Sequence, residues 1–135
     1  MRSLLAELFT QEAAFEADGV RQERALRELL ADPEGATLFV ARDAGGVVGM
    51  VCLLYVISTA LGRVTALLED MVVTEEARGQ GVGGQLIDFA IEHAKQRGCK
   101  RITLHTDEDN APAHRFYREH GFERCYMVPF WQKFE

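Results

Sequence analysis

The chain has 135 residues, of which 47% are hydrophobic and 27% are charged, and its formal net charge at pH 7 is -6. This length and composition fit one soluble globular domain, residues 1–135, which buries roughly two-thirds of its unfolded surface. The acidic balance argues against a nucleic-acid partner, because phosphate binding requires positive charge, and it is compatible with a cationic ligand.

The first part of the chain predicts two helices. Apolar residues between Leu4 and Phe15 recur at helical spacing, and Asp18-Gly19 interrupts this pattern. A second helix is expected over Val20–Ala31, because the residue before Pro33 is disfavoured in the helical conformation. The chain is therefore expected to begin directly in a helix.

Three strands are expected next. A short strand over Thr37–Ala41 and a longer one over Val47–Ile57 flank the turn Asp43-Ala44-Gly45-Gly46, so the two form a hairpin. Gly62-Arg63 then turns the chain into a third strand over Val64–Val73. These three strands are expected to be antiparallel neighbours.

The second half alternates helices and strands. We expect a helix over Gly83–Arg97 with Gly98 just after its end, a strand over Arg101–Thr106, a helix over Ala111–His120 and a final β segment over Phe122–Phe134. The resulting order α-α-β-β-β-α-β-α-β predicts an α/β (α+β) fold class. The sheet is expected to be mixed and mostly antiparallel, with helices on both of its faces.

The turn between the third strand and its helix has the composition of a phosphate-binding loop. Backbone N–H groups converge at a helix start, where the helix dipole adds positive potential, and glycines let an anion approach closely. A glycine turn without a ligand is the alternative, but four glycines after an arginine disfavour it. The residues assigned to an anionic ligand are Arg78, Gly79, Gln80, Gly81, Val82, Gly83 and Gly84.

Two familiar nucleotide motifs do not fit this turn. Gly79-x-Gly81-x-x-Gly84 satisfies the dinucleotide pattern GxGxxG, but that motif needs an acidic residue about twenty positions later for the ribose. Lys100–Leu104 contains none. A P-loop ends in Gly-Lys-Ser/Thr, whereas this turn ends in Gly83-Gly84-Gln85.

Two segments resemble the Gcn5-related N-acetyltransferase superfamily. Arg78, Gly81 and Gly83 match its motif Arg/Gln-x-x-Gly-x-Gly/Ala, and Asn110 to Phe122 matches its Asn followed by a helix ending in Phe-Tyr-x-x-x-Gly-Phe. The resemblance covers about 37–134. It implies that acetyl-CoA is the co-substrate, with its pyrophosphate at the glycine turn and its pantetheine arm in a gap where the central strands splay apart.

One departure from the family concerns the sheet edge. Members usually begin with a β-strand, which this chain lacks, so the strand at Thr37–Ala41 is expected to be an open edge. We expect either a second subunit, in a homodimer, or the N-terminal helix to cover that edge.

The resemblance also assigns the chemistry of acetyl transfer. Leu68-Glu69-Asp70-Met71-Val72-Val73 is similar to the segment before the glycine turn in diamine (spermidine/spermine) acetyltransferases, which implies that Glu69 is the base, directly or through water. Because side chains alternate along a strand, only one of Glu69 and Asp70 is expected to face the cleft, partly desolvated by its apolar flanks. The resemblance makes Tyr117 the general acid toward the CoA sulfur, and it gives cofactor contacts to Met71, Val72, Val73, Asn110 and Phe116.

The cysteines and apolar runs bear on the compartment. Cys52, Cys99 and Cys125 lie in apolar surroundings without metal-binding spacing, which is typical of buried thiols in a reducing compartment. The longest apolar run, Val47–Leu61, is too short to span a bilayer, and Glu7 makes the N-terminus unlike a signal peptide. We expect a cytoplasmic protein with no metal and no membrane or nucleic-acid partner.

These observations predict an N-acetyltransferase that moves an acetyl group directly from acetyl-CoA to a primary amine. A small cationic, polyamine-like amine is the favoured acceptor, and the acidic residues Glu12, Glu16 and Asp18 are either ordinary charged surface or part of its binding site. A protein or peptide N-acetyltransferase and a non-catalytic acyl-CoA-binding module are the alternatives. Turnover of small amines would indicate the favoured function, and turnover of peptides only would indicate the first alternative. Binding of acyl-CoA without turnover would indicate the second.

Overall fold

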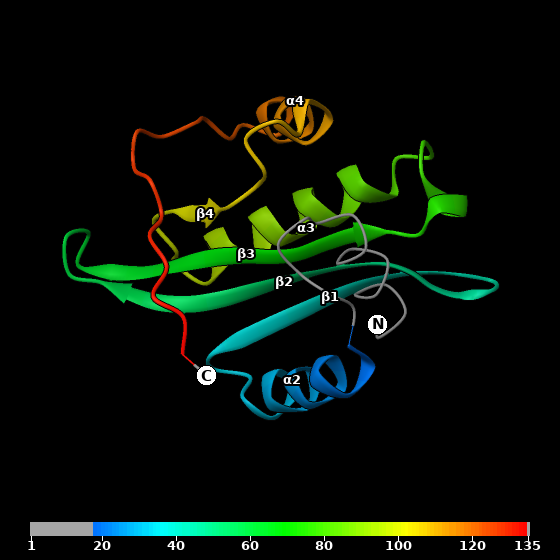
Figure 1. Cartoon of the computed structure of the whole chain (residues 1–135), viewed down its shortest axis with the longest axis horizontal. Coiled ribbons are helices and arrows are strands. Elements are labelled where there is room, and N and C mark those ends of the chain that lie inside the picture. Colours follow the sequence, from blue (N-terminus) through cyan, green and yellow to red (C-terminus); the bar gives the residue numbers. More distant parts are fainter. Residues whose placement is uncertain (1–17, 135) are drawn as a thin grey trace.

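A four-stranded sheet with helices on both faces organises this computed structural model, which describes residues 18–134 (Figure 1). The predicted helix between Leu4 and Phe15 lies outside the described residues, as do Glu12 and Glu16. The elements in chain order are α2 (Gly19–Ala31), β1 (Ala36–Asp43), β2 (Gly46–Ser58), β3 (Arg63–Val73), the short 3-10 helix η1 (Glu75–Ala77), α3 (Val82–Gln96), β4 (Ile102–Leu104) and α4 (Ala111–Glu119).

The strand order is β1-β2-β3-β4, and the pairing is mixed as predicted. The first three strands are antiparallel neighbours, whereas β3 and β4 are parallel because α3 connects them as a crossover. Within residues 18–134, β1 ends the sheet on one side. The expected lack of a strand before it concerns residues outside this range.

The helix α2 begins at Asp18, whose side chain caps it. The Asp18 Oδ1 atom accepts hydrogen bonds from the Val20 and Arg21 N–H groups, at 3.0 and 3.1 Å. Its second carboxylate oxygen forms an ion pair with Arg21 at 3.1 Å. Asp18 therefore has a structural role at the helix start. Leu26 of the same helix packs against Met50 and Val72 on one face of the sheet.

The main core lies between α3 and the opposite face of the sheet. Inward-facing residues of β2 and β3 contact the apolar side of α3, and the sheet lies between α3 above and α2 below in Figure 1. Each fully buried large side chain contributes about 1.5–3 kcal/mol. The residues of this cluster are Val51, Leu53, Ala66, Leu68, Leu86, Ile87, Ala90 and Ala94. The predicted inward positions of this helix are thus confirmed, except that Ile91 is only partly buried.

The prediction of a final β segment over Phe122–Phe134 is wrong, because this part of the chain forms no strand. Tyr126 and Phe130 are 92% and 94% exposed, so the apolar side chains that suggested a strand contact almost nothing. Cys125 is exposed as well, which corrects the expectation that all three thiols are buried. No helix within 18–134 is long and apolar enough to cross a membrane.

Candidate active site

A β-bulge in β3 sets the geometry of the site. Cys52 pairs with Glu69 and Met50 pairs with Val72, so two residues of β3, Asp70 and Met71, stand opposite one residue of β2. Asp70 has a φ of 54°, a left-handed conformation that aspartate tolerates better than most residues. The expected alternation of Glu69 and Asp70 is therefore wrong, because the extra residue brings both side chains to the same face of the sheet.

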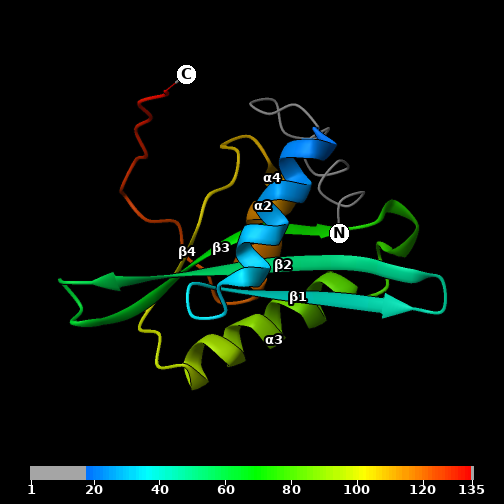
Figure 2. The same ribbon diagram turned by 90° about the horizontal axis from the view of Figure 1, so that it is seen from below.

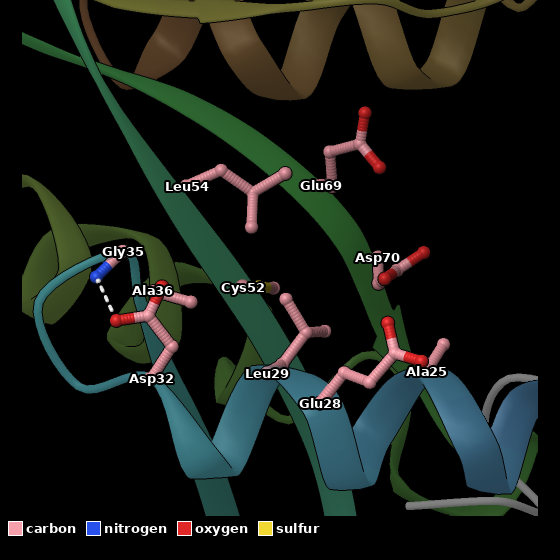
Figure 3. A pocket seen from close by; sticks show the side chains of 10 residues that line it. All are labelled: Ala25, Glu28, Leu29, Asp32, Gly35, Ala36, Cys52, Leu54, Glu69 and Asp70. Atoms are coloured by element: carbon pink, nitrogen blue, oxygen red, sulfur yellow. Dashed lines mark hydrogen bonds between the residues drawn. The ribbon is translucent and has the colours of Figure 1, made fainter.

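Both carboxylates line a pocket of about 560 Å³ between α2 and the sheet (Figure 3). Glu28 and Asp32, from α2 and its C-terminal end, line the other wall. Among residues 18–134, no lysine, arginine or histidine lines the pocket. The remaining lining residues are Ala25, Leu29, Gly35, Ala36, Cys52 and Leu54. Glu69 is exposed in this pocket, whereas its apolar flanks predicted a partly desolvated carboxylate.

The four carboxylates are spread along the pocket. In the described part of the chain, no group of three or more His, Cys, Asp or Glu side chains could hold a metal ion. Asp32 also accepts a hydrogen bond from the Gly35 N–H group at 3.0 Å, which holds the turn into β1 (Figure 3).

Cys52 forms part of the floor of the pocket and is 1% exposed. Burial, together with the negative charges of Asp70 and Glu69, raises the pKa of the Cys52 thiol from 9.0 to about 12. The thiol is therefore protonated at neutral pH, and a protonated buried thiol is a poor nucleophile.

The glycine turn lies C-terminal to the bulge, after the end of β3. Gly79 and Gly81 have φ values of 74° and 81°, which require glycine, and Gly81 is the N-cap of α3. Because this cap has no side chain, the first N–H groups of α3 have no side-chain acceptor at the cap. A turn of this kind, with positive potential from the helix dipole, fits a phosphate group.

Arg78 has a positioning role that the motif did not predict. Its Nε atom donates a hydrogen bond to the carbonyl of Val73 at 3.0 Å, so the side chain ties the turn to the end of β3. Gln80 donates in a similar way to the carbonyl of Glu76 at 3.3 Å. These two contacts stabilise the shape of the turn.

The central strands separate beside this turn, as predicted. The parallel pairing of β3 and β4 covers only Ala66–Leu68 and Ile102–Leu104, and beyond it β3 continues toward the turn with β2 as its one strand neighbour (Figure 1). The stretch from Glu69 to Val73 has no β4 partner on that edge. An unpaired strand edge offers backbone donors and acceptors to an extended, amide-containing ligand.

Helix α4 closes this side of the site. Asn110 is its N-cap, and its Oδ1 atom accepts from the Ala113 N–H group at 3.2 Å, so this oxygen is engaged within the chain. An added Cβ atom at Gly83 would lie 3.6 Å from the Phe116 ring, which places that ring beside the start of α3. Tyr117 is partly buried and packs edge-to-face on Phe116, with ring centroids 5.3 Å apart.

A histidine–aspartate pair joins α4 to α3 and could not be found from sequence. The Nδ1 atom of His120 lies 2.8 Å from Asp88 Oδ1, although the two residues are 32 positions apart. The Nε2 atom of His114 lies 2.8 Å from the Asp107 carbonyl oxygen. Both histidines thus hold α4 in place.

Known proteins resemble this chain over most of its length. The acetyltransferase (GNAT) family model matches residues 1–122. An aminoalkylphosphonate N-acetyltransferase of Salmonella typhimurium is 30% identical over 127 residues, covering 93% of this chain and 78% of the relative. An aminoglycoside N(6')-acetyltransferase type 1 of Serratia marcescens is 34% identical over 112 residues, covering 80% of this chain and 76% of the relative. A solved structure assigned as an acetyltransferase, from Agrobacterium tumefaciens str. C58, has a TM-score of 0.82 at 29% identity and covers 97% of this chain and 90% of its own. These matches support the superfamily and do not single out the diamine acetyltransferases.

Proposed function

The chain belongs to the acetyltransferase (GNAT) family, whose members use acetyl-CoA as co-substrate, and from this premise we propose that its acceptor is a small cationic amine of the polyamine type. The observation that carries this proposal is the acidic pocket, in which Glu28, Asp32, Glu69 and Asp70 face one cavity that no cationic side chain of the described residues lines. Two unit charges 4 Å apart attract by about 1 kcal/mol in water and about 4 kcal/mol near a protein surface. Such a pocket favours an acceptor with more than one ammonium group.

Glu69 is the proposed base and Tyr117 the proposed acid. An alkylammonium with a pKa of about 10.4 must lose a proton before it can attack, and Glu69 takes that proton directly or through water. The neutral amine nitrogen then bonds to the thioester carbonyl carbon and releases its second proton to water. The carbon–sulfur bond breaks, and Tyr117 gives its proton to the leaving thiolate and regains one from solvent. The protonated Cys52 thiol supports direct transfer to the amine over an acyl-cysteine intermediate.

The proposed donor site lies on the other side of the bulge. The pyrophosphate of acetyl-CoA binds the N–H groups of the turn from Arg78 to Gly84, and the pantetheine arm lies along Met71–Val73, on the edge of β3 that β4 does not cover. Asn110 and Phe116 contact the arm from α4. The uncapped start of α3 and the separated strands support this placement.

We also place the enzyme in the cytoplasm, as a homodimer. The free thiols of Cys52 and Cys99 support a reducing compartment.

An acceptor screen tests the proposal. Acetyl-CoA is mixed with a diamine, a polyamine, an aminoglycoside, an aminoalkylphosphonate and a lysine-containing peptide, and thiol release is followed. We expect turnover with the polycations and little with the phosphonate, because the carboxylates repel its anionic group. Turnover confined to the peptide, or binding of acetyl-CoA without turnover of any amine, would contradict the proposal.

Variants at the two proposed catalytic residues test the mechanism. Glu69→Gln and Tyr117→Phe should each lower kcat roughly 10²–10⁴-fold, the range of a positioned proton-transfer group. Glu92→Gln, an exposed change on α3, is the matched control and should leave kcat unchanged. If Glu69→Gln retains full kcat, Glu69 is not the base.

A further inference from the structure

The end of α4 places a histidine against the start of α3. Helix α4 lies across α3 rather than along it, so few residues connect the two helices (Figure 1, Figure 2). His120, the C-cap of α4, is one of them. Its side chain is 19% exposed, and its Nδ1 atom lies 2.8 Å from Asp88 Oδ1. The pair fixes the imidazole on the surface of α3.

The imidazole is oriented along the axis of α3. Gly84 and Asp88 are four residues apart on this helix, so they lie on the same face, about one turn from each other. A Cβ atom added to Gly84 would lie 3.4 and 3.6 Å from the Cε1 and Nε2 atoms of His120. Cβ positions in a helix point toward its N-terminus. Nδ1 is thus held at the Asp88 end, and the Nε2 edge of the ring faces the start of α3.

Gly84 leaves room for this ring. Unlike Gly79 and Gly81, it has no positive φ, so its backbone conformation does not require glycine. An added Cβ atom would already contact the imidazole, and a longer side chain would have to displace it. The Phe116 ring also packs against His120, with ring centroids 4.8 Å apart. The aspartate, the aromatic ring and the space at Gly84 together set the orientation of the imidazole.

The hydrogen bond to Asp88 decides what Nε2 can do. A carboxylate only accepts hydrogen bonds, so Nδ1 carries a proton. Among residues 18–134, Nε2 has no hydrogen-bond partner. In the charged imidazolium, Nε2 carries a proton as well and can donate it to an acceptor. Positive charge near the start of a helix is unfavourable on its own, so this arrangement is suited to binding an anion there.

We propose that His120 is a cofactor-binding residue whose Nε2–H group donates a hydrogen bond to a phosphate group of acetyl-CoA. This role rests on the proposed function, in which the pyrophosphate binds the glycine turn, and it adds a side-chain donor from α4. Hydrogen bonds between a charged donor and a phosphate are about twice as strong as neutral ones. Because Tyr117 lies on the same helix, the contact would also hold α4 beside the thioester.

Two substitutions at His120 separate phosphate binding from the anchoring of α4. Asparagine places an N–H group where Nδ1 lies, so His120→Asn keeps a donor to Asp88 and loses the donor to phosphate. Glutamine places an N–H group where Nε2 lies, so His120→Gln does the reverse. We expect His120→Asn to raise the Kd of CoA about tenfold, the lower end for a hydrogen bond to a charged group. His120→Gln should raise this Kd about threefold at most, because a neutral donor remains.

Calorimetry of CoA binding measures these effects, and His114→Gln is the matched control. His114 also lies on α4, but its Nε2 atom is beside the Asp107 carbonyl, so this change should leave the Kd unchanged. A loss of affinity in His120→Gln that equals or exceeds that in His120→Asn would show that His120 only anchors α4, and unchanged affinity in both would show no role. Either result overturns the proposal. A parent chain that does not bind CoA would instead contradict the proposed function itself.

Magnetic resonance of the ring nitrogens tests the parent chain directly. The chain contains four histidines, so the ring spectrum of the isotope-labelled protein is simple, and the signals missing from either His120 variant identify His120. Saturating CoA should shift the Nε2 signal of His120 toward that of a protonated, hydrogen-bonded nitrogen. The Nδ1 signal should move little, because Asp88 keeps its proton in place. An Nε2 signal that does not respond to bound CoA would contradict the hydrogen bond.

Discussion

At the scale of single residues, Asp70 decides how the acidic pocket is built. Its left-handed backbone creates the bulge that turns Glu69 and Asp70 toward the same cavity. Backbone conformations of this kind cost about 1–3 kcal/mol and persist where the surrounding structure fixes them, often at functional sites. The carboxylate and the backbone of Asp70 therefore make separate contributions, which two substitutions can separate.

Asp70→Gly and Asp70→Ala both remove the carboxylate, but only glycine adopts a φ of 54° freely. We expect the glycine variant to have the larger free energy of unfolding, by about 1 kcal/mol. Urea denaturation of the two proteins measures the difference. Equal stabilities would mean that the bulge exerts no backbone strain on residue 70.

Cys52 predicts a loss of stability at alkaline pH. The pKa of its thiol is about 12 in the folded protein, against an ordinary value of 9.0, so the folded state holds the proton that the unfolded state releases. The resulting stability is present below pH 9 and is lost as the pH rises toward 12, by at most about 1.4 kcal/mol per unit. Cys52→Ala should flatten this part of the curve of unfolding free energy against pH, and an unchanged slope would contradict the assignment.

At the scale of elements, the start of α3 depends on the left-handed turn before it. Gly81→Ala places a Cβ atom at a φ of 81°, which costs about 1–2 kcal/mol and distorts the N–H groups proposed to bind pyrophosphate. We expect lower stability and weaker binding of CoA, measured by calorimetry. Gly19→Ala is the control, because Gly19 has an ordinary φ and nothing within 4 Å of its added Cβ. Unchanged CoA affinity in Gly81→Ala would remove the turn from the cofactor site.

Local patterns in the sequence predicted most helices and strands, but they did not predict how the strands pair. Spacing of apolar residues located α3 and its inward residues Leu86, Ile87 and Ala90, because the periodicity of a helix is local. The bulge at Asp70 could not be predicted, since it depends on how β2 and β3 pair. The segment after Phe122 was predicted as a strand because its side chains favour that conformation. A strand also requires a neighbouring strand, which the local sequence does not reveal.

At the scale of the whole molecule, charge is expected to govern capture of the acceptor. The net charge of -6 and the acidic pocket both attract cations, and salt screens such attraction over about 10 Å at 0.1 M ionic strength. Each exposed ion pair contributes about 0.2–1 kcal/mol.

Raising the ionic strength at saturating acetyl-CoA should therefore raise the KM of a polyamine roughly two- to tenfold while kcat changes little. Steady-state kinetics with a monoamine of similar length provides the comparison, because it has fewer charges to screen. An equal effect on both acceptors would show that the pocket does not recognise multiple charges.

The placement of α2 and α3 on opposite faces of the sheet has an evolutionary consequence. The acidic wall of the pocket is formed by α2, whereas the glycine turn belongs to the start of α3. Substitutions at Ala25, Glu28 and Leu29 are therefore expected to alter the preference for the proposed amine acceptor without changing the glycine turn proposed to bind acetyl-CoA. During evolution, α2 can therefore change in sequence while the start of α3 stays the same.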